Sequence, residues 1–175
     1  MRRAEEPGKA LVLAAGAPSE RALAAVTALA RAGWGQVCVT VAPAEEADLQ
    51  RRVAGLALPG EAVVCLVLQR EGDDAAQAVL RARECLGEGP CLLALDPAAC
   101  LAPSAVPAPP GRPAGREGGL YLLPRGFHER LAETRRRGGD LLAALAATSQ
   151  HLVASQEGRP DRVYHYEGDR WVLEE

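Results

Sequence analysis

The sequence predicts an α/β fold in three layers, with helices on both faces of a mostly parallel sheet. Four short runs are almost entirely apolar, which is typical of strands buried on both faces. Segments with apolar residues at helical spacing separate these runs, and glycine or proline marks most of the junctions. Because strand–helix–strand units connect by right-handed crossovers, this order makes the strands parallel to one another.

The first half of the chain alternates strands and helices. Strands are expected over residues 9–15, 36–41, 62–68 and 91–95. Helices are expected from Ser19, over residues 45–56, and from Asp73 or Asp74 to Leu86. Ser19 is expected to cap the first of these helices, and Asp74 with Gln77 has the spacing of a capping box.

The second half is less regular. Residues 102–118 contain five prolines and no periodic apolar stripe, which predicts a mobile loop. After it we expect a strand over 119–123, a helix over 127–137, and a second helix that Asp140 caps and that runs through Ala147. Short strands are expected over 151–154, 163–166 and 171–173. The chain of 175 residues is therefore expected to form one domain over 9–175, preceded by a flexible leader over 1–8.

Composition excludes several classes of partner. The net charge is −3, which argues against nucleic acid, because that binding depends on basic contacts to phosphates. The basic run Arg135, Arg136 and Arg137 indicates a solvated helix end, with a phosphate-binding patch as the alternative. No apolar run is long enough to cross a membrane, so no membrane partner is expected. Free thiols without an export pattern favour the cytoplasm.

Metal and nucleophile motifs are absent from the cysteine and histidine spacing. No two of the five cysteines form CxxC, and we expect buried free thiols rather than metal ligands at Cys38, Cys65, Cys85, Cys91 and Cys100. The histidines show no ligand or triad spacing, so surface or packing roles are expected for His128, His151 and His165.

A ligand site is expected beyond the carboxyl ends of the strands, where open α/β sheets bind their ligands. Residues 16–21 join the first strand to its helix, and backbone amides there could hold an anion beside Arg21. A plain turn is the alternative, because Glu20 would repel phosphate. Asp96 ends the fourth strand, where a carboxylate holds a phosphate-bound divalent cation or simply ends the strand in an Asp-Pro turn. Asp73 and Asp74 are expected to cap a helix, with metal binding as the alternative.

The order of segments resembles the nucleotidyltransferases that join nucleoside triphosphates to sugar phosphates or to the molybdenum cofactor. The segments that carry this resemblance are 13–16 (LAAG), 33–41 (GWGQVCVTV), 69–80 (QREGDDAAQAVL), 91–97 (CLLALDP), 119–124 (GLYLLP) and 168–173 (GDRWVL). The resemblance implies a Rossmann-like three-layer sandwich. It also implies Mg²⁺ at Asp96 when nucleotide is bound, and nucleotide contacts at Ala15, Gly16, Ser19, Arg21 and Gln69.

The chain departs from this family at the residues that would carry the chemistry. Pro18 replaces a loop glycine, Arg21 stands one position further on than the family's basic residue, and the segment with the family's phosphate-binding lysine is absent. Lys9 lies at the start of the strand, at the end opposite the expected phosphate loop, and Leu173 stands where a second metal-binding aspartate is expected. Transfer of a nucleotidyl group depends on cations that neutralise phosphate charge, so these losses predict a defective catalyst.

We therefore expect a non-catalytic, nucleotidyltransferase-like domain that binds a nucleotide or nucleotide sugar, a protein partner, or a second copy of itself. Two alternatives are an active minimal Mg²⁺-dependent nucleotidyltransferase, in which Arg21 replaces the lysine, and an unrelated Rossmann-like binding protein. Tyr164, Tyr166 and Trp171 lie close together in a chain that is 3% aromatic, which favours a protein interface. Packing of this hairpin onto the sheet is the alternative.

Overall fold

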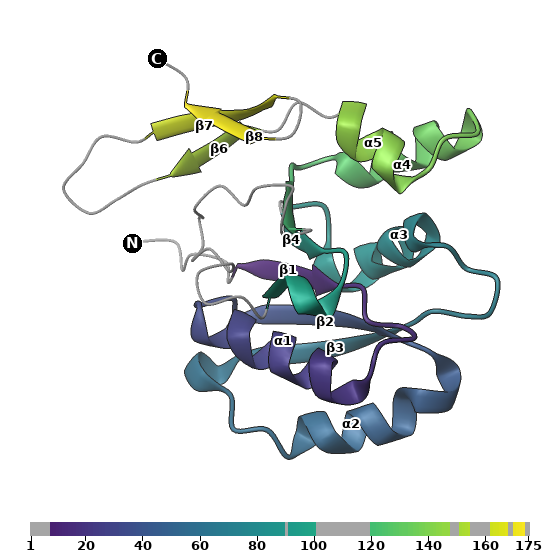
Figure 1. Ribbon diagram of the computed structural model, residues 1–175, viewed down its shortest axis with the longest axis vertical. Coiled ribbons are helices and arrows are strands. Elements are labelled where there is room, and N and C mark those ends of the chain that lie inside the picture. Colours follow the sequence, from purple (N-terminus) through teal and green to yellow (C-terminus); the bar gives the residue numbers. More distant parts are fainter. Residues whose placement is uncertain are drawn as a thin grey trace.

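The computed structural model describes residues 8–89, 91–100, 120–147, 151–154, 162–167 and 170–173. Its strands are β1 (Lys9–Val12), β2 (Gln36–Val41), β3 (Val63–Leu68), β4 (Cys91–Ala94), β5 (Leu120–Leu123), β6 (His151–Ala154), β7 (Arg162–Glu167) and β8 (Arg170–Leu173) (Figure 1). Its α-helices are α1 (Ser19–Arg31), α2 (Glu46–Ala54), α3 (Ala75–Leu86), α4 (Phe127–Arg136) and α5 (Leu141–Ala147). Short 3-10 turns are η1 (Pro43–Glu45), η2 (Pro59–Glu61) and η3 (Pro97–Cys100). The predicted loop over 102–118 and residues 1–7 of the predicted leader lie outside the described residues.

The main sheet has five strands in the order β3-β2-β1-β4-β5. The first four are parallel, with Leu11 of β1 paired to Cys38 of β2 on one side and to Leu93 of β4 on the other. At the edge, β5 runs antiparallel to β4. This order places β1 in the middle and confirms the predicted α/β fold, a Rossmann-like sandwich with a mostly parallel sheet.

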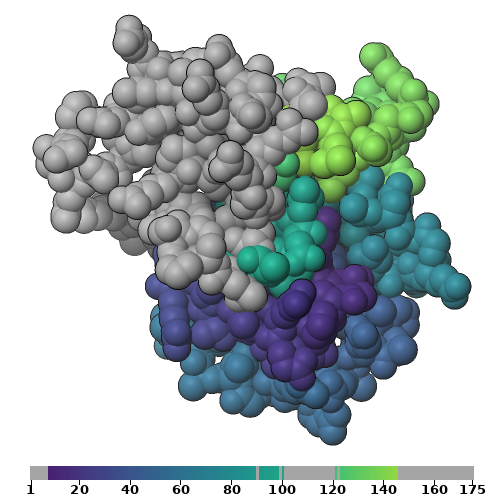
Figure 2. Space-filling view, viewed as in Figure 1, coloured from purple at the N-terminus to yellow at the C-terminus, as the bar shows by residue number. Residues whose placement is uncertain are grey.

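Helices cover both faces of this sheet, which gives the three layers that the sequence predicts. Successive strand residues point to opposite faces, so Ala10 and Val12 pack with α1 and α2, whereas Leu11 packs with α3, α4 and α5. Figure 1 shows α1 and α2 together on one side of the strands and α3 on the other. Figure 2 shows η3 lying over α1. Leu11 is fully buried, and burial of such a side chain contributes about 1.5–3 kcal/mol.

Two helix caps follow the sequence prediction and one does not. The Asp74 side chain accepts from Gln77 N at 2.9 Å, and Asp140 Oδ1 accepts from Ala143 N at 2.8 Å. The prediction that Ser19 caps α1 is wrong, because Pro18 occupies the N-cap position without a side-chain hydrogen bond. The Pro18 carbonyl already accepts from Arg21 N and Ala22 N, so the helix begins one residue before a serine cap would start it.

The segment after α5 forms a separate antiparallel sheet in the order β6-β7-β8. Tyr166 and Trp171 are Cα partners in it, as are His151 and His165, which confirms the predicted short strands and hairpin pairing. The turn residues 168–169 and the side chains of these strands lie outside the described residues. The aromatic interface therefore stays a prediction. Among the described residues, none of the helices combines the length and apolarity needed to span a bilayer.

Candidate functional site

A cavity of about 450 Å³ opens at the carboxyl ends of β1, β3 and β4. Its walls come from the segments that follow these strands and from the first residues of α1 and α3. In the sheet, β2 and then β3 follow β1 on one side, whereas β4 lies on the other side of β1. The cavity therefore lies at the point where strand order reverses, which is where open α/β sheets bind ligands.

Most of the residues predicted from the sequence line this cavity. Ala15 and Gly16 come from the β1–α1 connection, and Arg21 comes from the first turn of α1. Gln69 follows β3, and Asp96 follows β4. The sixth predicted residue, Ser19, is not among the lining residues, whereas its neighbour Pro18 is. Segments up to 81 positions apart in the chain, from Ala15 to Asp96, thus meet in one place. Whether these residues bind nucleotide stays a prediction.

The β1–α1 connection is shaped by a residue that the sequence did not single out. Thr40, near the end of β2, is fully buried, and its Oγ1 accepts from Ala14 N at 2.9 Å and from Ala15 N at 3.3 Å. The strand β1 ends at Val12, earlier than the predicted residue 15, since these two amides bond to a side chain of β2 and not to the backbone of that strand. The amides of Ala14 and Ala15 already have a hydrogen-bond acceptor in Thr40, so fewer backbone amides of the loop are free to bind an anion.

The charge around this loop differs from the sequence expectation. The Glu20 carboxylate pairs with Arg52 of α2 at 2.9 Å and is not part of the cavity wall. Its own backbone hydrogen bond and the Arg52 guanidinium lower the pKa of Glu20. In the described cavity wall, Arg21 supplies the only cationic side chain. The predicted repulsion of phosphate by Glu20 is therefore weakened, because an arginine compensates this charge.

Asp96 forms the Asp-Pro turn, one of the two roles that the sequence left open, and whether it also holds a cation stays a prediction. It is exposed at the end of β4, and its Oδ1 accepts from Ala98 N at 2.7 Å, so the Asp-Pro turn is present. The same residue lines the cavity. A carboxylate has about four lone-pair positions on two oxygens, so one backbone bond leaves capacity for a cation.

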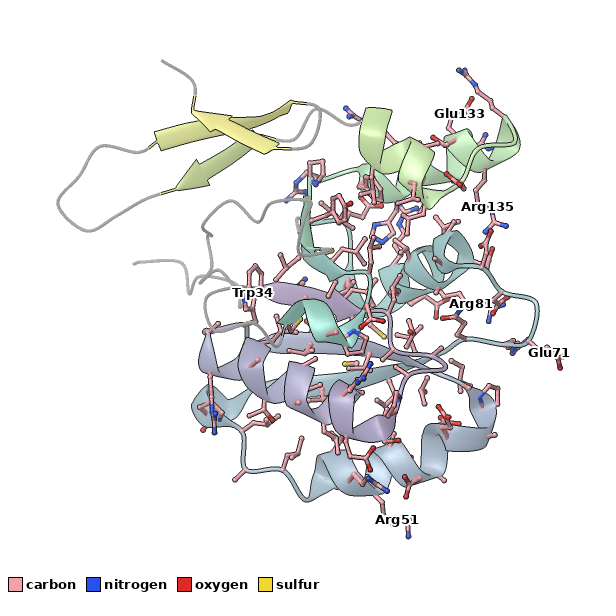
Figure 3. All side chains as sticks on the ribbon, viewed as in Figure 1. Trp34, Arg51, Glu71, Arg81, Glu133 and Arg135 are labelled. Carbon is pink, nitrogen blue, oxygen red and sulfur yellow. The ribbon has the colours of Figure 1, made fainter. Side chains whose placement is uncertain are left out.

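The wall beyond β3 is braced by ion pairs. Gln69 Nε2 donates to Asp73 O at 3.2 Å, and the Asp73 carboxylate pairs with Arg81 at 2.6 Å. Asp74, besides capping α3, pairs with Arg135 at 2.8 Å, and Figure 3 shows Arg81 and Arg135 on this side of the molecule. Asp74 thus caps α3 as predicted. The prediction that Asp73 also caps a helix is wrong, because its carboxylate accepts from Arg70 N in the loop and pairs with Arg81.

The basic run at the end of α4 is a helix end, as predicted. Besides the pair that Arg135 makes with Asp74, Arg136 and Arg137 both pair with Glu133, at 3.2 and 3.0 Å. With these partners the run does not present a cationic patch for phosphate.

A second cavity of about 330 Å³ adjoins the first one. The two share Leu13, Ala75 and Leu95 in their walls, and the second continues toward the start of α5 at Leu141 and Leu142. Its wall is mainly apolar, and Leu142 is one of the few large apolar side chains exposed in the described part of the chain. The carboxyl edge of the sheet thus offers room for a ligand larger than the first cavity alone would hold.

The cysteines are free, as predicted, but they are not all buried. Cys38, Cys91 and Cys100 lie in the interior, Cys65 is half-buried, and Cys85 is exposed. Burial raises the pKa of Cys91 and of Cys100 to about 12, so these two thiols stay protonated at neutral pH. The prediction of burial is wrong for Cys85, because the exposure of a residue in the last turn of α3 depends on the tertiary packing.

His128 has the packing role predicted for it. It lies on α4 and is 4% exposed, and within the described residues its Nε2 has no hydrogen-bond partner. Desolvation chiefly, and then the charge of Arg83, lower the pKa of His128 below 6.5. The folded protein therefore resists protonation of this ring more than the unfolded chain does.

We expect this residue to make folding pH-dependent. As pH falls below 6.5, the unfolded chain binds a proton at His128 before the folded protein does, so the free energy of unfolding falls. Urea unfolding at pH 8 and at pH 5.5 measures the loss. The His128→Leu variant should show a flatter dependence in this window, since carboxylates titrate mostly lower. An unchanged slope in this variant would show that other groups cause the dependence.

Comparisons with known proteins give only distant likenesses. No family model matches the chain, and no curated protein matches it. One similar solved structure is a UDP-glucose pyrophosphorylase complexed with UDP-glucose, at 16% identity over 51% of this chain and 46% of that one, with a TM-score of 0.32. A second is a UTP-bound UGPase from Acinetobacter baumannii, at 14% identity over 91% of this chain and 66% of that one, with a TM-score of 0.39. A third is an apo UDP-glucose pyrophosphorylase, at 10% identity over 91% of this chain and 68% of that one, with a TM-score of 0.37.

The chain thus spans about half the length of the first of these structures and about two thirds of the other two. At such identities and TM-scores the likeness does not define a family or an activity. The function has to follow from the residues of the cavity.

Proposed function

We propose that the cavity at the carboxyl ends of β1, β3 and β4 binds a nucleotide or nucleotide sugar. We propose further that the chain is a nucleotidyltransferase-like binding module without catalytic turnover. One observation carries the proposal: a cation, Arg21, and an exposed carboxylate, Asp96, lie on the wall of one cavity at the reversal of strand order. This pairing suits a phosphate chain that arrives with a divalent cation.

Arg21 and the start of α1 supply the phosphate side of the proposed site. The guanidinium of Arg21 is exposed and always charged, and its planar donors match phosphate oxygens in pairs. The positive end of the α1 dipole points toward the same loop. Gly16 lines the cavity with a φ of +83°, a conformation that favours glycine and brings the backbone near a ligand. These features together favour an anion over a neutral ligand.

Asp96 supplies the metal side. Magnesium keeps several waters in its octahedral shell and is commonly held by one or two carboxylates together with substrate phosphates. A single aspartate at the cavity therefore suffices to hold Mg²⁺ when a nucleotide brings it, and the hydrogen bond from Ala98 N orients the Asp96 carboxylate. Gln69, across the cavity, adds an amide oxygen that would accept from a nucleobase donor.

The same wall argues against turnover. Nucleotidyl transfer requires charges that stabilise the transition state more than the bound substrate. In the described wall of the cavity, Arg21 is the only cation and Asp96 the only carboxylate. Lys9 lies at the opposite end of β1, where its Nζ donates to Leu86 O at 3.0 Å. Binding of phosphates is thus supported more strongly than the chemistry of their transfer.

An active minimal nucleotidyltransferase is the second candidate, and the adjoining cavity of about 330 Å³ favours it. A cavity that continues from the first one gives room for an acceptor molecule beside a nucleotide. In that case Arg21 and Mg²⁺ at Asp96 would carry the charge of the transition state together. Mg²⁺-dependent release of pyrophosphate from a nucleoside triphosphate and a sugar phosphate would establish this candidate and refute a purely binding role.

Substitution of Arg21 tests the phosphate contact. We expect Arg21→Gln to weaken binding of nucleoside triphosphates about 10- to 100-fold, because a charge-assisted hydrogen bond is worth about 1.5–3 kcal/mol. Isothermal calorimetry measures the change. Arg31→Gln is the matched control, since Arg31 is an exposed arginine in the last turn of the same helix. Equal affinities of the two variants would mean that Arg21 makes no contact with the ligand.

A further inference from the structure

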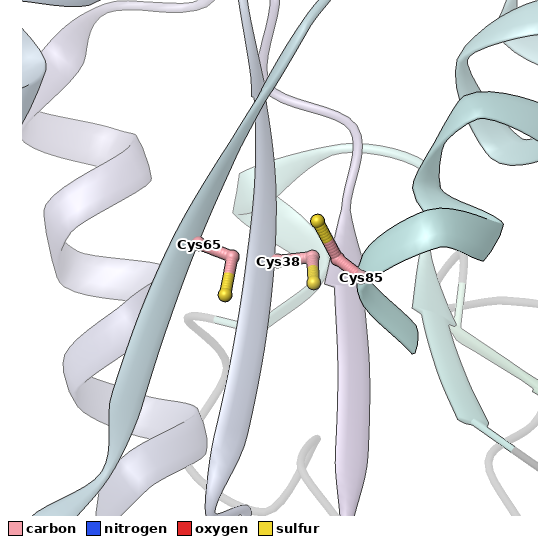
Figure 4. Close-up of side chains that lie close together, drawn as sticks. All are labelled: Cys38, Cys65 and Cys85. Atoms are coloured by element: carbon pink, nitrogen blue, oxygen red, sulfur yellow. The ribbon is translucent and has the colours of Figure 1, made fainter. Parts of the chain in front are cut away.

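Three cysteines that are far apart in the sequence meet on the α3 side of the sheet. Cys38 and Cys65 are Cα partners on the neighbouring strands β2 and β3, and Cys85 comes from the last turn of α3. Their sulfur atoms all lie within 4.8 Å of one another. Figure 4 shows the three side chains gathered in the space between the strands and the helix.

We propose that Cys38, Cys65 and Cys85 form a binding site for one thiophilic metal ion of the Zn²⁺ class. Zinc–thiolate bonds are about 2.3 Å long, so sulfurs that share one ion lie about 4 Å apart. The observed spacing of up to 4.8 Å therefore needs only a small rotation of the side chains. A disulfide requires about 2.05 Å between two sulfurs and would leave the third without a partner. The spacing thus suits a shared ion better than a disulfide.

The surroundings provide access and a second layer of contacts. Cys85 is exposed and Cys65 half-buried, so an ion can enter from solvent, while Cys38 closes the inner side. Gln36 Nε2 lies 4.0 Å from Cys65 Sγ and donates to Cys85 O at 2.8 Å. Three thiolates and one divalent ion together carry a net negative charge. The Gln36 amide beside the cluster stabilises this charge. Three protein ligands leave a fourth position open to water or to a further ligand.

Binding exchanges protons for metal bonds. Without an ion, burial raises the pKa of the Cys38 thiol, and the neighbouring Cys65 adds to this effect. An ion that coordinates a thiol deprotonates it outright, so each sulfur that binds releases its proton to solvent as the metal–sulfur bond forms. No oxidant or reductant is needed.

The site is separate from the nucleotide cavity. Cys65 is the third residue of β3, and Gln69, which lines the cavity, follows the end of that strand. Four residues of strand span roughly 13 Å. A metal ion bound to the three cysteines links β2, β3 and α3, away from the cavity. It stabilises the fold and takes no part in phosphate binding.

Titration of the reduced, metal-free full chain with Co²⁺, a coloured substitute for Zn²⁺, tests the proposal. We expect one equivalent to produce the intense near-ultraviolet absorption of cobalt–thiolate bonds, and added Zn²⁺ to displace it. Cys85→Ala should weaken binding by about 100-fold or more, since even outer contacts of a metal contribute 10- to 100-fold. Cys85 is exposed, so this variant keeps the core intact.

Cys100→Ala is the matched control, because Cys100 is a free thiol outside the cluster and should leave the cobalt spectrum unchanged. A thermal shift with Zn²⁺ alone gives an independent measurement, with a rise expected for the wild type and for Cys100→Ala only. The proposal is overturned by the absence of a cobalt–thiolate band, or by equal affinities of wild type and Cys85→Ala.

Discussion

Thr40→Val should lower the free energy of unfolding by about 2 kcal/mol, because a buried amide left without a partner costs about 1–3 kcal/mol. Thr40 Oγ1 accepts from both Ala14 N and Ala15 N, and the first of these bonds is buried. Valine has nearly the same shape, so the loss is that of the hydroxyl acceptor and leaves no cavity. Urea unfolding at neutral pH measures the effect.

The same substitution should weaken nucleotide binding, since Ala15 and Gly16 of the freed loop line the proposed site. Thr27→Val is the matched control. Thr27 lies on α1, where its hydroxyl donates to Leu23 O at 2.9 Å, and a helical carbonyl of this kind already has a backbone donor. We expect its effect on stability to stay within about 0.5 kcal/mol. Similar losses in both variants would contradict the role assigned to Thr40.

Asp96→Asn should remove most of the Mg²⁺ dependence of nucleotide binding while the fold stays intact. The asparagine oxygen can still accept from Ala98 N, so the turn after β4 keeps its hydrogen bond. Only the negative charge is lost, and with it the affinity for a hard cation. We expect the gain in affinity on adding Mg²⁺ to fall from about tenfold or more in the wild type to near unity, a difference of about 1.4 kcal/mol.

Glu71→Gln provides the control for this charge. Glu71 is an exposed acid in the loop after β3 that does not line the cavity, and Figure 3 shows it projecting away from the strands. This variant should respond to Mg²⁺ as the wild type does. A loss of the same size in both variants would assign the effect to net charge and not to a metal at Asp96.

The layers of the fold were predictable because they depend on local patterns. Continuous apolar runs bury both faces of a strand, and β2 has the residues that the sequence predicted for it, Gln36–Val41. Aspartates at helix starts act within a few residues, so Asp74 and Asp140 could be assigned as caps. The antiparallel direction of β5 was not predicted, because it depends on the connection through residues 101–119, which carries no periodic pattern.

The candidate site was predictable only where its residues follow directly from the order of strands along the chain. The rule that ligands bind at the carboxyl ends of parallel strands led to Gly16, Arg21 and Asp96. Thr40 and the cysteine cluster escaped prediction because they depend on register between strands, which one sequence does not reveal. Cys38 and Cys65 are both the third residue of a six-residue strand, and this shared position is a signal that could have indicated their pairing.

Calorimetry of the wild-type chain with nucleoside triphosphates and nucleotide sugars, with and without Mg²⁺, tests the proposed function most directly. We predict saturable binding of at least one nucleotide, strengthened by Mg²⁺ in the wild type and not in Asp96→Asn, without release of pyrophosphate. Absence of binding at ligand concentrations on the order of millimolar, where even affinities of about 4 kcal/mol are detected, would contradict a nucleotide site in this cavity.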